Sequence, residues 1–284
     1  MSLLPIYQVD AFTDRAYSGN PAAVCLVQPT QCPPQSNRMQ QIAAELNLSE
    51  TAFVMSTAQQ AGDQQPVALG FYPQMDRLNI RYFTPKIEVP LCGHATLASA
   101  HLIWDLGIAP FHESVSFQTV TGERLACQRA SDGWITMDFP SDPPFAVEAP
   151  AGLLAAIGIK PIAVARSRDW LIEVATEAEL LRAKPDFPAL CGFERGVILT
   201  AACSAPNTDF VSRCFYPALG VNEDPVTGSA HCALAPYWQR RLGKDMLEAR
   251  QVSSRGGQLR LTCGGDRVGI AGCAVTKMRG EWLV

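Results

Sequence analysis

Short apolar runs separated by turn residues dominate this chain and predict a structure rich in β-strands. The runs are bounded by glycine, proline, asparagine or serine, as expected for strands that meet at turns. We expect strands at residues 6–12, 22–27, 50–55, 78–83, 114–118, 123–128, 134–139, 164–166, 170–174, 197–202 and 209–215. Further strands punctuated by glycine are expected after residue 243.

Few segments show the three-to-four-residue apolar spacing of a helix. In residues 36–46 one face collects Met39, Ile42, Ala43 and Leu46, and Ser36 is expected to cap this helix. Other helices are expected at 96–106, 153–157, 177–183 and 230–242, the last with Pro236 as a kink or a late start. Many strands with one principal helix per half predict an α+β fold in two lobes.

A repeated pattern supports the division into two lobes. Arg-x-Phe-x-Pro occurs at 81–85 and again at 213–217, and each copy is followed by a glycine, Gly93 or Gly228, that precedes a helical run of small residues. Such a duplication predicts similar lobes whose helix N-termini face one another across a cleft. Because helix N-termini expose unpaired N–H groups and a partial positive charge, the pair would bind an anion. The ligand we expect is a small carboxylate.

Composition excludes several other classes of protein. The chain has 284 residues, of which 48% are hydrophobic and 18% charged, as in a globular protein. A net charge of −4 without basic runs argues against nucleic acid as a partner. We find no signal peptide and no apolar stretch long enough for a bilayer, so no membrane partner is expected. The ten cysteines form no CxxC pair, and the simplest interpretation is reduced core thiols in a cytoplasmic protein.

Aligning the repeats identifies candidate ligand-binding residues at the helix starts. Cys92 pairs with Thr227, the two glycines pair, and His94 pairs with Ser229. These are also ordinary helix-start residues, but capping alone does not require the same surrounding sequence twice. The helix field disfavours imidazolium, so we expect a neutral His94. His101 and His231 are expected to be core or supporting residues.

Two acidic residues have both structural and functional interpretations. Asp224 precedes Pro225 and suits a helix N-cap, but a carboxylate there could also contact a substrate amine or carry a proton. Glu50 heads an apolar strand, where a glutamate is usually only the exposed end. If it is buried, its raised pKa would suit proton transfer. The pattern by itself does not favour Glu50 over Glu45 or Glu88.

Several motifs, in order along nearly the whole chain, resemble the PhzF-type phenazine-biosynthesis family. They are Val9-Asp10-Ala11-Phe12, Ser18-Gly19-Asn20-Pro21-Ala22-Ala23-Val24, Leu48-Ser49-Glu50-Thr51-Ala52-Phe53, Arg81-Tyr82-Phe83-Thr84-Pro85, Pro90-Leu91-Cys92-Gly93-His94-Ala95-Thr96, Glu223-Asp224-Pro225-Val226-Thr227-Gly228-Ser229-Ala230-His231 and Arg255-Gly256-Gly257. The resemblance implies a diaminopimelate epimerase-like fold, with two similar lobes that are each a barrel-like sheet around a central helix. We expect an N-terminal lobe of residues 1–118 joined by the last strand at 274–284, and a C-terminal lobe of residues 119–273.

The resemblance also implies roles for individual residues. Glu50 would be the catalytic acid/base, and the substrate would be lined by Asn20, His94, Asp224 and Ser229, with the backbone at Gly93 and Gly228 holding its carboxylate. Family members are typically cofactor-independent and often homodimers. No cofactor or metal is therefore expected.

The favoured hypothesis is an isomerase that moves a proton on a small carboxylate-bearing substrate, either amino-acid-like or dihydroaromatic. A racemase or epimerase of a related substrate is an alternative, but two-thiol epimerisation needs an acid and a base on opposite faces, and Thr227 replaces the second thiol. Another alternative is a non-catalytic metabolite-binding or interaction protein that keeps the fold. A third is a thiol enzyme or metal site built on Cys92 and His94.

Overall fold

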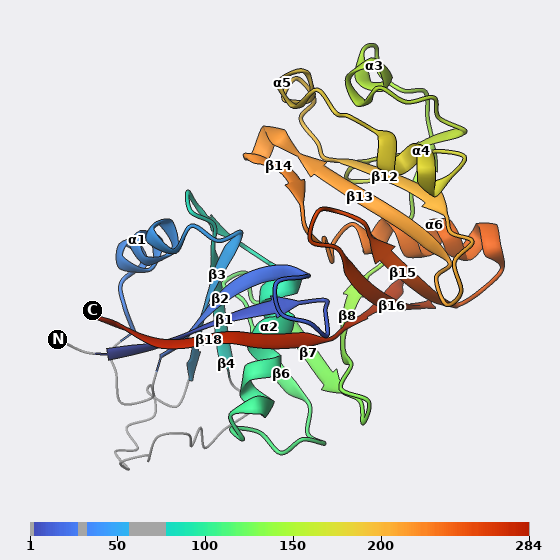
Figure 1. The fold of residues 1–284 in the computed structure, drawn as a ribbon. Coiled ribbons are helices and arrows are strands. Elements are labelled where there is room, and N and C mark those ends of the chain that lie inside the picture. The colour runs from blue at the N-terminus through green and yellow to red at the C-terminus, as the bar shows by residue number, and fades with distance from the viewer. Residues whose placement is uncertain (1–2, 28–32, 57–77, 284) are drawn as a thin grey trace. The chain divides into compact units, whose positions relative to one another are not determined.

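The computed structural model describes residues 3–27, 33–56 and 78–283 (Figure 1). The chain divides into two compact units, Met1–Asp138 with Ala271–Val284, and Phe139–Ile270. No helix in the described part of the chain is long and apolar enough to cross a membrane.

The first unit is a sheet whose central strands β1, β2 and β3 are mostly buried, whereas β7 and β8 alternate buried positions with more exposed ones. Its strands are β1 (Leu3–Ala11), β2 (Asn20–Val27), β3 (Glu50–Ser56), β4 (Leu78–Phe83), β5 (Glu88–Val89), β6 (Val115–Gln118), β7 (Arg124–Arg129), β8 (Ile135–Pro140) and β18 (Ala274–Leu283). They pair in the order β18-β1-β2-β3-β4-β6-β7-β8, and only β2–β3 and β4–β6 are parallel. The short β5 pairs with β4.

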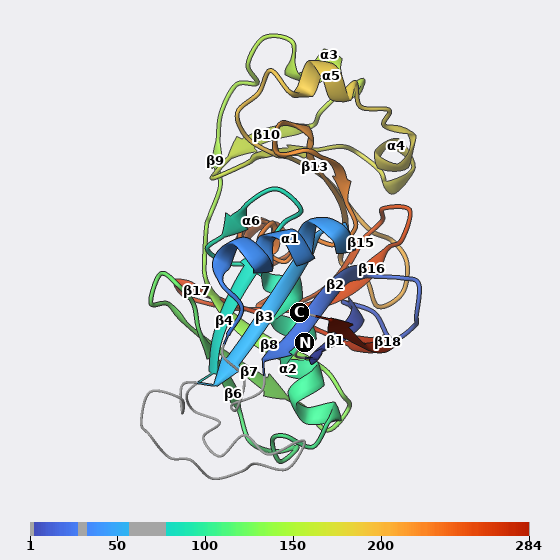
Figure 2. The ribbon, with the colours of Figure 1, turned by 90° about the vertical axis from the view of Figure 1, so that its left-hand side faces the viewer.

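Two helices accompany this sheet. Helix α1 (Ser36–Leu46) buries Met39, Ile42 and Ala43 on one face. Helix α2 (Gly93–Asp105) is buried from His94 to Trp104, because it is apolar or small-sided all round, and such a helix is stable only inside a core. It packs against β1, β2, β3, β7 and β18, and Figure 2 shows it within these strands.

The second unit contains more short elements. These are β9 (Phe145–Ala146), α3 (Leu153–Ile157), β10 (Ala163–Arg166), β11 (Trp170–Glu173), α4 (Glu177–Arg182), α5 (Phe187–Leu190), β12 (Val197–Ala202), β13 (Phe210–Tyr216), the 3-10 helix η2 (Pro217–Leu219), β14 (Val221–Asp224), α6 (His231–Leu242), β15 (Met246–Gln251), β16 (Gly257–Gly264) and β17 (Arg267–Gly272). The pairing order is β9-β10-β11-β12-β13-β15-β16, parallel at β11–β12 and β13–β15.

The two units repeat one topology. In each unit, two antiparallel strands (β1 and β2, or β10 and β11) are followed by a strand parallel to the second of them (β3 or β12). The motif strand (β4 or β13) is antiparallel to that strand and pairs with a short antiparallel strand (β5 or β14). The motif strand also pairs in parallel with a later strand (β6 or β15). The main helix, α2 or α6, follows the short strand both times. The predicted duplication and the α+β class are therefore confirmed.

The repeated Arg-x-Phe pattern has a structural role, because in each unit its arginine joins two strands. Arg81 binds Glu88 of β5 through two contacts of 2.7 Å, and its guanidinium lies 5.1 Å from the Phe83 ring centroid. Arg213 binds Glu223 of β14 at 2.7 and 3.0 Å and lies 5.0 Å from the Phe215 ring. In both units the arginine thus fastens the motif strand to the short strand that leads into the main helix.

Several expectations about boundaries need correction. The first unit extends to Asp138 rather than ending at residue 118, because β7 and β8 continue the sheet from β6. The expected return of the last strand agrees with the pairing of β18 to β1. The proline-rich stretch 140–150 contains the short strand β9.

Local details at the helices also differ from expectation. Gln35, not Ser36, is the N-cap of α1, and the Ser36 hydroxyl instead accepts a hydrogen bond from Arg81. Helix α6 begins at His231, so Pro236 lies inside it and does not mark a late start. Nine cysteines in the described segments are free thiols, four of them buried, while Cys32 lies outside those segments.

Candidate active site

The N-terminus of α2 lies in a largely buried part of the first unit. Cys92 is the N-cap and makes no side-chain capping bond, and the first turn carries no acidic residue. The carbonyl of Cys92 accepts hydrogen bonds from the Thr96 backbone N–H at 3.0 Å and from its hydroxyl at 2.7 Å. Helix geometry leaves the N–H groups of the first turn without intrahelical acceptors. This end of α2 therefore has the donors and the dipole to bind a carboxylate.

Glu50 and His94 meet at this helix end. Glu50 is the first residue of β3, and His94 is the second residue of α2. Glu50 Oε2 lies 3.2 Å from His94 Nε2, with side-chain exposures of 21% and 7%. Glu50 is therefore neither a fully exposed strand end nor a fully buried acid.

His94 is a neutral imidazole with a defined tautomer. Burial lowers its pKa to about 3, which agrees with the expected neutral state, although desolvation rather than the helix field is the leading cause. An ionised Glu50 can only accept, so Nε2 must carry the proton that it donates to Glu50. The other nitrogen, Nδ1, lies 3.4 Å from Cys92 Sγ and accepts from the thiol. Cys92, His94 and Glu50 thus form a chain of polar contacts.

Asn20 lies close to Glu50 through the strand register. It is the first residue of β2, it is fully buried, and its side-chain oxygen accepts from Ser49 at 3.3 Å. Because β2 and β3 are parallel with Ala22 opposite Glu50, the turn motif and the acid share one end of the sheet. Asp10 has a structural role: it binds Lys277 at 2.9 Å and the Tyr17 N–H at 2.8 Å.

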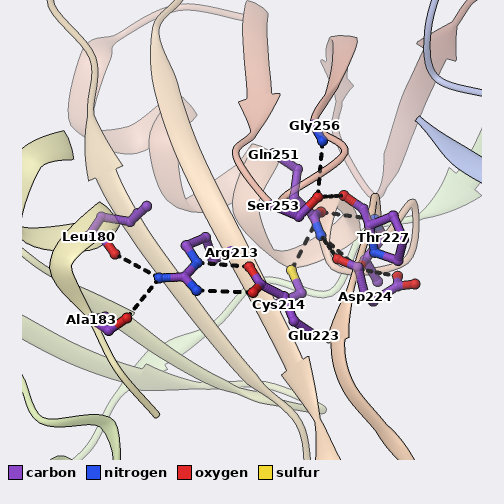
Figure 3. Close-up of polar contacts among 11 residues, drawn as sticks. Leu180, Ala183, Arg213, Cys214, Glu223, Asp224, Thr227, Gln251, Ser253 and Gly256 are labelled. Atoms are coloured by element: carbon purple, nitrogen blue, oxygen red, sulfur yellow. Dashed lines mark hydrogen bonds and ion pairs between the residues drawn. The ribbon is translucent and has the colours of Figure 1, made fainter. Parts of the chain in front are cut away.

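In the second unit the motif around Asp224 is organised by a residue that the sequence analysis missed. The buried Gln251 at the end of β15 accepts from the Thr227 N–H at 2.8 Å and donates to the Asp224 carbonyl at 2.7 Å (Figure 3). Thr227 in turn donates its hydroxyl to the Asp224 carboxylate. No local sequence pattern identifies Gln251, because it is 24 residues or more from both partners.

The second helix start differs from the first, and two expectations about it are wrong. Asp224 is not the N-cap of α6: it ends β14, and Ala230 holds the cap position. Residues Gly228–Ala230 form a tight turn, with the His231 N–H bonded to the Gly228 carbonyl at 3.0 Å. Gly228 therefore does not open its helix as Gly93 does. Gly228 is buried, whereas Ser229 is exposed.

The two histidines expected to be supporting residues are both buried. His231 Nδ1 lies 2.8 Å from the Thr227 carbonyl, which repeats the Thr96 contact to the Cys92 carbonyl four residues back. Burial lowers the pKa of His231 to about 4. His101 lies 3.1 Å from Thr276. Glu50, Asn20, Gly93 and His94 thus gather in the first unit, and Asp224, Gly228 and Ser229 in the second.

Comparison with known proteins agrees with the fold and the motifs. A family model described as Phenazine biosynthesis-like protein matches residues 9–280. An uncharacterized isomerase of Halalkalibacterium halodurans is 44% identical over 287 residues, with 100% of both chains covered. The crystal structure of a phenazine biosynthesis protein of the PhzF family from Enterococcus faecalis has a TM-score of 0.86 at 37% identity and 100% coverage of both chains. A hydroxyproline epimerase from Agrobacterium vitis has a TM-score of 0.58 at 11% identity, with 98% and 92% covered, and shares the fold alone.

The fold and these relatives define an isomerase with the diaminopimelate epimerase-like architecture of two similar units. Within that class, the chain belongs to the phenazine biosynthesis-like family, also called PhzC-PhzF.

Proposed function

We propose that this isomerase moves a proton between two carbons of a small carboxylate-bearing substrate, with Glu50 as the single acid/base. The observation that carries the proposal is the 3.2 Å contact between Glu50 and the neutral His94 at the N-terminus of α2. The Glu50 carboxylate takes a proton from one carbon, and the electron pair delocalises toward the substrate's unsaturated or carboxylate group. The protonated Glu50 then returns the proton to a different carbon, so no net proton or electron is gained or lost.

His94 and the helix end supply the electrostatic part of this proposal. The Nε2–H of His94 orients the Glu50 carboxylate and, being neutral, does not neutralise its negative charge. The first-turn N–H groups of α2 bind the substrate carboxylate and stabilise the negative charge that develops in the transition state. Groups that stabilise the transition state more than the ground state raise kcat.

Asn20, Asp224, Gly228 and Ser229 are proposed as further substrate contacts. Asp224 already accepts the Thr227 hydroxyl, and this bond orients its carboxylate for a contact with a substrate amine. The same bond supports an isomerase over a two-thiol epimerase, because Thr227 hydrogen-bonds an acid and offers no thiol. We further propose a cofactor-independent homodimer, which light scattering of the purified protein would test.

The decisive experiment follows proton exchange in heavy water. The protein is incubated with a panel of small amino and hydroxy carboxylates and dihydroaromatic acids, and deuterium uptake is followed by NMR. Glu50→Gln should abolish exchange while substrate binding stays measurable. Glu45→Gln, at an exposed position on α1, is the matched control and should exchange as the wild type does. Exchange retained in Glu50→Gln would refute the role of Glu50.

A further inference from the structure

The three polar groups at the start of α2 have the identities and spacing of metal ligands. Glu50, Cys92 and His94 each offer one ligand atom, and these atoms all lie within 4.8 Å of one another. Nε2 of His94 is 3.2 Å from Glu50 Oε2 and 3.9 Å from Cys92 Sγ. Tetrahedral Zn²⁺ with ordinary bond lengths separates such ligand pairs by about 3.3–3.6 Å. The two His94 distances are therefore close to those of a zinc site, and the Glu50–Cys92 pair lies within 4.8 Å.

We propose that Glu50, Cys92 and His94 bind Zn²⁺ and that the bound ion inhibits the enzyme. The metal would bind the Glu50 oxygen that carries the proton in the proposed function, and its bond to Nε2 would require the His94 proton to move to Nδ1. Zinc binding and general acid/base catalysis are therefore mutually exclusive at this site. The inhibitory part of the inference rests on the proposed function of Glu50, whereas the binding part does not.

Charge balance favours the ion in this buried position. One carboxylate and one thiolate neutralise a divalent cation, so the site adds no net charge to the interior and avoids most of the desolvation cost of an isolated ion. The positive end of α2 opposes a cation but stabilises the Cys92 thiolate at the N-cap.

The surrounding structure holds the ligands in place. Cys92 and His94 are two residues apart, and the backbone that joins them is fixed by the two bonds from Thr96 to the Cys92 carbonyl. The Thr96 hydroxyl is fixed in turn by Tyr82, whose oxygen lies 2.5 Å away. Supporting contacts of this kind lower the ordering cost of metal binding. With three protein ligands, the fourth zinc position stays open to water or to a substrate carboxylate.

Cobalt titration tests the binding directly. Co²⁺ bound by a thiolate gives a charge-transfer absorption band, which Zn²⁺ should displace at one equivalent. The wild type and Cys191→Ser, which removes the exposed thiol, should show this band. Cys92→Ser should lose it and bind Zn²⁺ at least about 100-fold more weakly, since losing even an outer-shell partner costs 10–100-fold. A band that survives in Cys92→Ser, or is absent from the wild type, overturns the proposal.

A second variant and an activity arm complete the test. Glu50→Gln should keep the thiolate band but weaken Zn²⁺ binding. The site therefore remains testable if circular dichroism shows that Cys92→Ser does not fold. Unchanged affinity in Glu50→Gln would remove Glu50 from the site and refute the three-ligand proposal. In the exchange assay, one equivalent of Zn²⁺ should stop turnover and a chelator should restore it. Zinc binding to a protein that never exchanges protons would refute the proposed function alone. Full exchange with zinc bound would refute the inhibition.

Discussion

The side-chain oxygen of Gln251 accepts the backbone N–H of Thr227 at 2.8 Å, and its nitrogen donates to the Asp224 carbonyl at 2.7 Å. One buried amide from β15 therefore joins the last residue of β14 to Thr227, between β14 and α6. The Cys214 thiol lies 3.6 Å from the same Gln251 oxygen. The backbone next to Asp224, a proposed substrate contact, thus depends on Gln251.

Gln251→Leu should destabilise the protein by about 2–5 kcal/mol, because it removes the partner of two backbone groups, the buried Thr227 N–H and the partly buried Asp224 carbonyl. Chemical denaturation followed by circular dichroism measures this change. Gln258→Leu, at an exposed position on β16, should change stability by less than about 0.5 kcal/mol. Equal effects of the two substitutions would contradict a special role for the Gln251 amide.

His94→Asn should lower kcat by about 10²–10⁴-fold, because Glu50 loses the donor that orients it. The measurement is the rate of proton exchange at saturating substrate. The change should fall mainly on kcat, since the carboxylate-binding N–H groups of α2 belong to the backbone. His112→Asn, at an exposed position, is the control. A variant with unchanged kcat would show that Glu50 works without His94.

The stability of the protein should fall as the pH drops below about 6.5. Burial lowers the pKa of His231 to about 4 and that of His94 to about 3, so the unfolded chain binds these protons at a higher pH than the folded protein does. Each neutral histidine contributes its stability fully above the unfolded pKa of about 6.5 and loses it progressively down to the folded pKa. The loss approaches about 1.4 kcal/mol per pH unit for each histidine.

Denaturation curves between pH 7 and pH 4.5 give the slope of the unfolding free energy against pH. This slope is separate from any pH-independent effect of a substitution on stability. His231→Gln should reduce the slope by nearly one proton. If this variant keeps the wild-type slope, His231 is not the buried neutral group that the structure indicates.

Arg213→Lys should destabilise the protein more than Arg81→Lys. Both arginines bind a glutamate through two contacts, but Arg213 also donates to the carbonyls of Leu180 and Ala183 at 3.2 and 3.0 Å. A lysine cannot reproduce this planar set of donors, and the carbonyl of the buried Ala183 would lose the Arg213 donor, whereas the Leu180 carbonyl would keep the Ala183 N–H. We expect a loss of about 2–4 kcal/mol for Arg213→Lys and about half of that for Arg81→Lys, measured by denaturation. The reverse order would contradict this assignment.

The repeated motif predicted the duplicated fold because each copy lies on the corresponding strand of its unit, β4 or β13, and precedes the main helix, α2 or α6. Apolar runs gave β4, β12 and α3 with the observed bounds, since strand and helix periodicity depend on neighbouring residues. The resemblance to a family identified Glu50, which the apolar pattern alone did not separate from Glu45 or Glu88. The first unit then placed Glu50 against His94.

The interpretations that failed depended on contacts between distant residues. Asp224 followed by Pro225 is an ordinary helix-start pattern, but the Thr227 hydroxyl and Gln251 hold this segment as an extended entry to a later helix. The sequence pattern predicted Ser36 as a helix cap, but its hydroxyl accepts a hydrogen bond from Arg81 of β4. The first unit extends past its expected end at residue 118 because β7 and β8 pair with the same sheet.

The sequence by itself determined the class of fold, its duplication and the chemical identities of the candidate site, because periodicity, repeats and motifs are local properties of the chain. Only the tertiary structure decided which of these groups touch. It brought the carboxylate of Glu50, the imidazole of His94 and the thiol of Cys92 to one helix end, and it supplied Gln251 to the second motif. Such contacts join residues far apart in the chain, and their distances are set by how strands and helices pack.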